Sequence, residues 1–267
     1  MASDLLTSTD AAAFLDVGVS TIKRWADEGI VPCVRTVGGH RRFQRQVLVA
    51  HAATAQAEGG PQLETTRWIG TLRTEGVHQV IGALHMARHR HGSWWRVARE
   101  LGEVLAEVGR QWSEGEITIL DEHASTERLR RGLTMVTESM PSPAVAPEVL
   151  LMAAEGEEHT MGLSLVELCA REAGWVTRWA GTRTPLSEID RALEADTPAL
   201  LAVSASVFGH GRDALMGQCE ALEAVAERHG VTLVLGGEGP WPATPRYASR
   251  LWSFETLHRL LVKAVAS

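Results

Sequence analysis

The distribution of apolar and polar residues divides most of the chain into a helical stretch and an alternating stretch. Residues 66–139 contain almost no proline and little β-branched alternation. This pattern predicts four helices, at about residues 66–74, 76–89, 93–112 and 117–138. Helices of this length joined by short breaks pack as a four-helix bundle. The pattern changes at Pro141-Ser142-Pro143, which indicates a domain boundary.

Short apolar runs alternate with helix-like runs from residue 145 onward. The apolar runs at 149–154, 175–180, 199–204 and 231–235 predict strands, and the segments 163–173, 186–195 and 212–229 predict helices between them. Strands joined by helical crossovers are parallel. We therefore expect a Rossmann-like, doubly wound α/β domain over residues 145–267.

The first 57 residues predict a compact DNA-binding unit. Two short helices flank Gly18, and the second would present four polar residues to DNA: Ser20, Thr21, Lys23 and Arg24. Extended residues around Gly38-Gly39 then predict a hairpin wing with four basic residues: Arg35, His40, Arg41 and Arg42. A solvated charged face is the alternative for an isolated Lys-Arg pair, but helix, turn, helix and basic wing together favour DNA. The stretch Glu58-Gly59-Gly60-Pro61-Gln62 would end this unit.

Charge and cysteine content narrow the function classes. A net charge of −7 argues against a nucleic-acid coat over the whole chain but allows a local DNA-binding patch. Cys33, Cys169 and Cys219 are isolated, which argues against a disulfide framework and a thiolate metal site. The chain has no apolar run of about 18 residues and no signal-peptide pattern, so we expect a cytoplasmic protein without membrane association.

A candidate metal ligand follows the first predicted strand of the α/β domain. In Glu157-x-His159-x-x-Gly162 the histidine lies at the carboxyl end of a parallel strand, where ligands bind in such folds. A neutral imidazole can bind a metal while Glu157 holds its other ring nitrogen. Gly162 would let a bulky ligand approach the backbone. A solvated loop histidine is the alternative reading.

Two further strand ends carry small or hydroxyl side chains. Ser204 ends the third predicted strand, and Gly236-Gly237 ends the fourth. Taken alone these are ordinary loop features, and no phosphate-binding Gly-rich loop is present. Trp241 and Trp252 nearby are interpreted as core residues.

Three motifs resemble known families. The first fifty residues resemble the DNA-binding domain of MerR-family regulators, in which Gly-Gly-His-Arg-Arg-Phe is a frequent wing sequence. Glu157-x-His159-x-x-Gly162 resembles the Asp-x-His-x-x-Gly signature of base-off, His-on cobalamin-binding domains, with glutamate in place of aspartate. Trp112-x9-Glu122-His123 is similar to the helical domain of cobalamin-dependent MerR-type photoreceptors, the CarH and LitR group.

The resemblance implies a role for each motif residue. His159 would be the lower axial ligand of cobalt, supported by Glu157, and Trp112, Glu122 and His123 would cover the upper face of the corrin. Ser204, Gly236 and Gly237 would line the slot for the displaced dimethylbenzimidazole tail, with Gly162 beside them. Ser113 departs from the pattern, because members of this group can carry a cobalt-binding histidine there. Domains would span residues 1–57, 66–140 and 145–267.

The function implied is that of a regulator without enzymatic activity. By resemblance, adenosylcobalamin would assemble a homo-oligomer, a tetramer, that represses transcription on double-stranded operator DNA, and light would cleave the cobalt–carbon bond and release the DNA. Two alternatives remain open: a corrinoid methyltransferase component, and a regulator that senses another ligand, such as haem held between His123 and His159.

Overall fold

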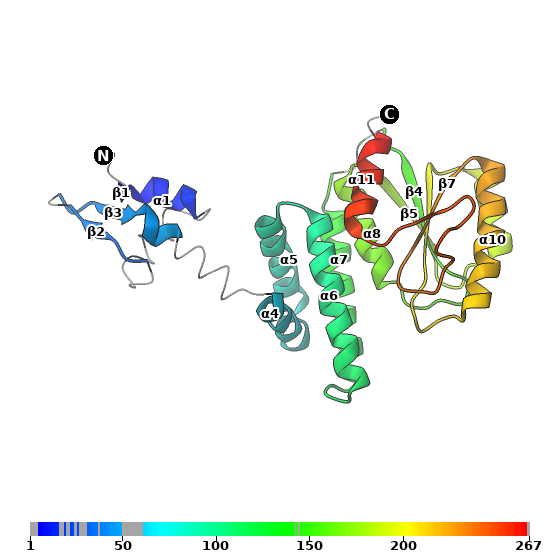
Figure 1. The fold of residues 1–267 in the computed structure, drawn as a ribbon, viewed down its shortest axis with the longest axis horizontal. Helices are drawn as coiled ribbons and strands as arrows, with labels where there is room; N and C mark the ends of the chain where they lie inside the picture. Colours follow the sequence, from blue (N-terminus) through cyan, green and yellow to red (C-terminus); the bar gives the residue numbers. More distant parts are fainter. Residues whose placement is uncertain are drawn as a thin grey trace. The chain divides into compact units, whose positions relative to one another are not determined.

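The chain forms two compact units, Met1–Thr66 and Arg67–Ser267 (Figure 1). The computed structural model describes residues 5–15, 19, 22–23, 26, 31–36, 38–49, 61–141, 143 and 145–265. Three of the predicted DNA-contacting residues, Ser20, Thr21 and Arg24, lie outside these ranges. The two units have separate hydrophobic cores and are described individually.

The N-terminal unit is a small three-stranded sheet with helices. Strand β3 (Arg41–Gln44) lies between β1 (Leu5–Leu6) and β2 (Val34–Arg35), and both pairs are antiparallel. Helix α1 (Ser8–Phe14) begins with a capping box, in which the Thr7 hydroxyl and the Asp10 carboxylate each accept from the other's backbone N–H. The core contains these buried residues: Ala11, Ala12, Ile22, Val31, Phe43 and Leu48.

The predicted wing is present as the hairpin of β2 and β3. The Thr36 N–H donates to the His40 carbonyl oxygen at 2.9 Å, and the Gly39 N–H donates to the Thr36 carbonyl oxygen at 2.8 Å. Gly39 has a φ of 79°, a conformation that favours glycine. Because Phe43 is buried while its basic neighbours stay more exposed, the hairpin is anchored from one side.

Four helices follow, as the sequence predicts: α4 (Pro61–Thr74), α5 (Val77–His91), α6 (Trp94–Ser113) and α7 (Ile119–Glu138). Helix α4 starts five residues before its predicted start of 66, because proline is well suited to the first helical position. Gly92, in the left-handed conformation, ends α5. A capping box between Thr118 and Asp121 starts α7. No helix in the described part of the chain has the length and apolar character needed to cross a membrane.

The α/β part is built on a five-stranded parallel sheet. Its order is β5 (Val176–Gly181), β4 (Glu148–Ala153), β6 (Leu200–Ser204), β7 (Thr232–Gly236) and β8 (Ser249–Arg250). The predicted doubly wound fold is therefore confirmed. The order reverses between β4 and β6, so the carboxyl ends of these two strands flank the point where such sheets bind ligands.

Helices cover both faces of the sheet. Helices α8 (Met161–Glu172) and α11 (Phe254–Val265) lie on one face, and α9 (Leu186–Ala195) and α10 (Arg212–His229) lie on the other (Figure 1). Side chains of β4 alternate accordingly: Val149 and Leu151 pack with the bundle helices, whereas Leu150 and Met152 pack with α9 and α10. The bundle and one face of the sheet thus share a single core.

Polar contacts reinforce the junction between bundle and sheet. Arg88 on α5 forms an ion pair with Glu172 on α8 at 3.0 Å, and the Trp94 N–H donates to the same carboxylate at 2.7 Å. On the same turn of α5, His91 pairs with Glu100 at 2.5 Å. The basic cluster at the end of α5 therefore has acidic partners that are distant in sequence.

Candidate functional site

A buried carboxylate organises the loop between β4 and α8. Glu157 is 0% exposed. Its Oε1 accepts from the N–H groups of Glu158 at 3.0 Å and His159 at 2.8 Å, and its Oε2 accepts from the N–H and Oγ of Ser206 at 2.7 and 2.8 Å. Burial alone would raise the pKa of Glu157, but these hydrogen bonds outweigh it and lower the pKa to about 2. The group is therefore an ionised acceptor at neutral pH.

The carboxylate orients the neighbouring imidazole. His159 Nδ1 lies 2.6 Å from Glu157 Oε1, and because the ionised carboxylate only accepts, Nδ1 carries the proton. The Nε2 lone pair of His159 is then available on a side chain that is 61% exposed. A histidine held by a carboxylate on one nitrogen and open on the other has the arrangement of a metal ligand.

Sequence reasoning missed the residues that complete this arrangement. Ser206, on the loop after β6, supplies two of the hydrogen bonds to Glu157 from 49 positions away. On the same loop, a Cβ added at Gly209 would lie 2.7 Å from Glu157 Oε2, so only glycine leaves room for the carboxylate. The Phe208 ring lies 5.9 Å from the His159 ring. A serine and a glycine in a loop carry no signal of such a contact when the sequence is read by itself.

The turn before Glu157 is fastened to α10. The Glu155 N–H donates to Gln218 Oε1 at 2.9 Å, and Gln218 Nε2 donates back to the Glu155 carbonyl oxygen at 3.1 Å. His210 Nε2 also lies 2.6 Å from that carbonyl oxygen. Because these contacts come from the protein, the loop is positioned before any ligand binds.

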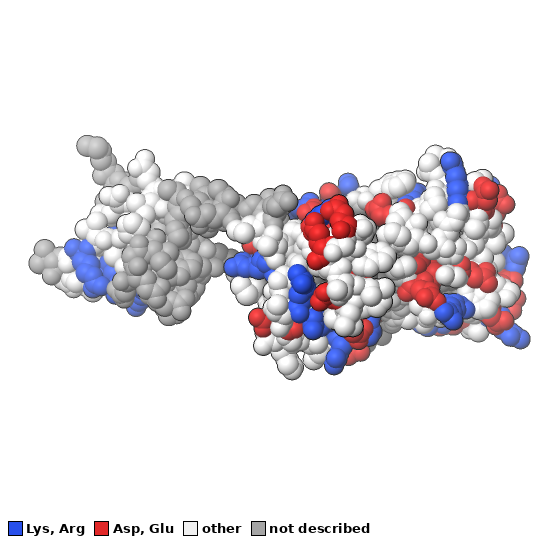
Figure 2. Space-filling model, turned by 90° about the horizontal axis from the view of Figure 1, so that it is seen from below, with Lys and Arg blue, Asp and Glu red and all other residues white. Residues whose placement is uncertain are grey.

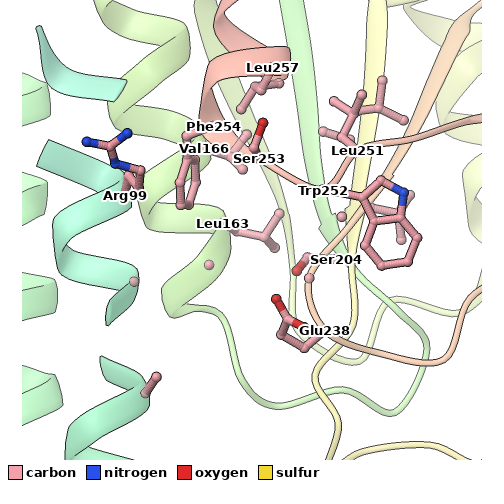
Figure 3. Close-up of a pocket in the computed structure, with 18 of the residues that line it drawn as sticks. Arg99, Leu163, Val166, Ser204, Glu238, Leu251, Trp252, Ser253, Phe254 and Leu257 are labelled. Carbon is pink, nitrogen blue, oxygen red and sulfur yellow. The ribbon is translucent and has the colours of Figure 1, made fainter. Parts of the chain in front are cut away.

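A cavity of about 500 Å³ opens next to this loop (Figure 3). It lies among α6, the start of α8, the ends of β6 and β7, and the segment that leads into α11. Gly162, Ser204, Gly236 and Gly237 line it, so the structure brings together these four predicted site residues. Most of the remaining wall is apolar.

Ser204 is one of the polar residues that line this cavity. The residue is 8% exposed, and among the residues that the structure describes none hydrogen-bonds to its Oγ. A Cβ at Gly237 would lie 2.8 Å from this Oγ and 2.2 Å from the Ala205 carbonyl oxygen, and Gly237 has a φ of 78°. The Oγ is not fully buried but is accessible from the cavity, where a hydroxyl can donate or accept one hydrogen bond. The cavity is thus suited to a ligand that brings one hydrogen-bonding atom to Ser204.

The two tryptophans near the cavity have different environments. Trp241 is 5% exposed and its Nε1 donates to the Gly236 carbonyl oxygen at 2.9 Å, so its interpretation as a core residue is confirmed. The same interpretation was wrong for Trp252, which is 69% exposed and lines the cavity, with the Arg250 guanidinium 4.1 Å from its ring centroid. Trp252 follows the short edge strand β8, where little structure is available to cover it.

The predicted upper-face residues lie at the turn between α6 and α7. Trp112 is in the last turn of α6 and is 42% exposed. Glu122 and His123 are in the first turns of α7, where the imidazole of His123 hydrogen-bonds to the Glu122 carboxylate. Within the described part of the chain, no hydrogen bond, ion pair or ring contact joins these three residues to His159. The Ser113 hydroxyl donates to the Arg110 carbonyl oxygen at 2.8 Å.

The described DNA-binding candidates gather on the N-terminal unit. Arg35 ends β2, His40 is in the turn, and Arg41 and Arg42 begin β3, while Lys23 is in a helical segment. Figure 2 shows basic side chains on the described part of this unit, whereas acidic and basic side chains are interspersed over the C-terminal unit. The local basic surface is the feature expected of a DNA-binding module in an acidic protein.

Comparison with known proteins identifies both modules. The family model described as a helix-turn-helix domain matches residues 5–55, and that described as a B12 binding domain matches residues 97–137. The chain is 26% identical over 229 residues to the HTH-type transcriptional repressor CarH of Myxococcus xanthus, covering 73% of this chain and 76% of that protein. It is 34% identical over 90 residues to the transcriptional repressor DcmR of Methylorubrum extorquens, covering 33% of each.

A solved structure has the same fold as the C-terminal unit. The Methanosarcina barkeri monomethylamine corrinoid protein matches with a TM-score of 0.54 at 16% identity, over 74% of this chain and 96% of that one. At this identity the likeness concerns the fold alone. The chain therefore combines a helix-turn-helix domain with a B12-binding module, and it is similar over most of its length to the CarH-type, cobalamin-binding transcription regulators.

Proposed function

We propose that the chain is a cobalamin-dependent transcription repressor that acts in the cytoplasm and binds operator DNA as an adenosylcobalamin-assembled, light-sensitive homo-oligomer. The observation that carries this proposal is the Glu157–His159 pair, which lies beside the cavity that Ser204 lines. A DNA-binding unit on the same chain favours a regulator over the alternative of a corrinoid methyltransferase component, since methyl transfer needs no DNA reader.

The lower face of the site suits a corrinoid whose nucleotide base has left the cobalt. His159 Nε2 would take the lower axial position, and Glu157 would hold the imidazole in the required tautomer. The displaced base would enter the cavity of about 500 Å³, where the Ser204 hydroxyl would meet its ring nitrogen. The unpartnered hydroxyl and the tight approach at Gly237 support this fit.

Trp112, Glu122 and His123 would cover the upper face. Ala106 lines the cavity, and Trp112 lies six residues farther along the same helix, roughly 9 Å along its axis. Because α6 extends past the cavity in this way, Trp112 could lie above a corrinoid bound at the carboxyl ends of the strands. Adenosylcobalamin would supply a light-labile cobalt–carbon bond. Ser113 offers no imidazole, so no side chain at this position would capture cobalt after photolysis.

Assembly would control repression through avidity. The N-terminal unit would contact DNA with Ser20, Thr21, Lys23 and Arg24 from its helix and with Arg35, His40, Arg41 and Arg42 from its wing. Linking several such units in one homo-oligomer, expected to be a tetramer, raises the effective local concentration of each DNA-binding unit at the operator. Light-driven dispersal would remove this advantage without altering any single contact.

The cofactor assignment is tested by electron paramagnetic resonance of the full chain reconstituted with Co(II) cobalamin. With its histidines labelled with nitrogen-15, the wild-type chain should show splitting by the labelled nucleus, which is lost in His159→Ala and retained in His78→Ala, a variant that removes an exposed histidine on α5. The label is needed because the benzimidazole of cobalamin can itself supply an axial nitrogen. Splitting by the labelled nucleus that persists in His159→Ala would refute the axial role. Failure of the wild-type chain to bind any corrinoid would refute the proposed function.

The DNA and light assignments have separate tests. Arg41→Ala with Arg42→Ala should weaken operator binding and reduce the slope of log affinity against log salt by about one per lost phosphate contact. An unchanged slope would contradict the wing assignment. Size-exclusion chromatography of the adenosylcobalamin-loaded chain should show a larger species in the dark than after illumination, and identical elution would contradict light-gated assembly.

A further inference from the structure

The wall of the cavity beside Ser204 is mostly apolar, and this limits which ligands the cavity can bind. An apolar surface is formed by residues from two separate segments, α8 and the stretch 251–257: Leu163, Val166, Leu251, Phe254 and Leu257. Figure 3 shows Leu163 and Ser204 with Phe254 and Trp252 around the same space. A planar base that enters this space would lose water from most of its edge and contact apolar side chains instead.

The other polar side chains in the wall are already occupied or lie in solvent. Ser253 Oγ accepts from the Thr256 N–H at 3.2 Å and lies 2.9 Å from Thr256 Oγ1, capping α11. Arg99, Glu103 and Glu238 are exposed, so water can solvate their charges at the mouth. Among the side chains of the described wall, Ser204 thus provides a hydroxyl that faces the cavity and has no hydrogen-bond partner among the described residues.

One hydroxyl in an apolar wall can satisfy one hydrogen-bonding atom of a buried base. A benzimidazole released from cobalt presents one ring nitrogen, and the rest of its edge is carbon and hydrogen. A purine of the adenine type also carries an exocyclic amine and further ring nitrogens. These would be desolvated against the leucines and Phe254 without partners, and an unpaired buried polar group typically lowers affinity by roughly ten- to a hundredfold.

We propose that this cavity makes the protein selective for corrinoids with a benzimidazole-type lower base over those with a purine-type lower base. This inference rests on the proposed function, because it concerns the base that would occupy the cavity. Val166 is a specificity-determining residue in this scheme, since it is half-buried in the wall. Threonine has nearly its shape but adds a hydroxyl.

The test compares two corrinoids that differ in the lower base alone, cobalamin and its adeninyl counterpart, with the same upper ligand. Equilibrium dialysis with the full-length chain in the dark gives both dissociation constants. We expect the adeninyl form to bind at least about tenfold more weakly. In Val166→Thr the ratio should fall severalfold, whereas Val262→Thr, the same change on an exposed position of α11, should leave it unchanged.

The possible outcomes distinguish failure of the base selectivity from failure of the proposed function. Equal affinity of the wild-type chain for the two corrinoids overturns the selectivity and leaves the proposed function standing. Failure to bind either one overturns the proposed function itself. A wild-type preference that Val166→Thr leaves unaltered, while circular dichroism shows a folded variant, removes Val166 from the selecting wall.

Discussion

Replacing Glu157 with glutamine should destabilise the C-terminal unit by about 2–4 kcal/mol. The carboxylate accepts five hydrogen bonds, from Glu158, His159 and Ser206. A glutamine amide nitrogen on either side would face a backbone N–H, leaving at least one buried donor unsatisfied at a cost of about 1–3 kcal/mol. The remaining bonds would lose their charge assistance, which adds about 1 kcal/mol.

Urea unfolding of the full chain, followed by tryptophan fluorescence, measures this loss. Glu158→Gln is the matched control: the neighbouring side chain is exposed and pairs with exposed Arg183, so its loss should change stability by no more than about 0.5 kcal/mol. If Glu157→Gln unfolds at the same urea concentration as the control, the organising role of Glu157 is refuted.

The same variant should lose an acid-dependent part of the stability. The pKa of Glu157 is about 2 in the folded chain and 4.5 as its ordinary value, so the folded state favours the charged form. The stabilisation is complete above pH 4.5 and is lost as the pH falls from 4.5 towards 2, by up to about 3 kcal/mol. Stability measured over this range should fall more steeply in the wild-type chain than in Glu157→Gln, and parallel curves would contradict the assignment.

Two glycine substitutions should be costly where a third is not. Gly237→Ala places a Cβ 2.2 Å from the Ala205 carbonyl oxygen at a φ of 78°, so we expect a lower melting temperature and weaker corrinoid binding. Gly132→Ala places a Cβ 2.9 Å from Val80 Cγ1 between α7 and α5, and should cost up to about 2 kcal/mol in urea unfolding. Gly217→Ala, on α10 with nothing within 4 Å, should instead stabilise by up to about 1 kcal/mol, and a similar effect of all three would contradict both packing arguments.

Much of the fold could be predicted because it depends on local periodicity. The strand runs and the helices between them follow from alternation and from helical spacing, and α9 and α10 begin and end where the pattern predicts. Strand β8 and helix α11 were not predicted. A strand of two residues is too short to show an alternating pattern. Without that strand, the sequence gives no sign that another helix follows and covers the sheet.

The candidate site divides in the same way. The Glu157–His159 pair is two residues apart, so its spacing makes it a candidate from the sequence, with a solvated loop histidine as the alternative. Ser206 and Gly209 contact Glu157 only because β4 and β6 are neighbours in the sheet, and nothing within either loop encodes that contact. The grouping of Trp112 with His159 stays a prediction, since the structure joins them by no contact among its described residues.

Glutamate at position 157, where the cobalamin-binding signature has aspartate, has a physical explanation in the neighbouring loop. The side chain is one methylene longer than aspartate, yet His159 Nδ1 still lies 2.6 Å from its carboxylate. The extra length carries the second oxygen to Ser206, and the missing Cβ of Gly209 leaves the space that this oxygen fills. A longer acid on one loop and a glycine on the other thus preserve the contact that orients the imidazole. The substitution therefore does not weaken the proposed role of His159 as a ligand, and the main departure from the pattern of the CarH and LitR group is Ser113, on the proposed upper side of the site.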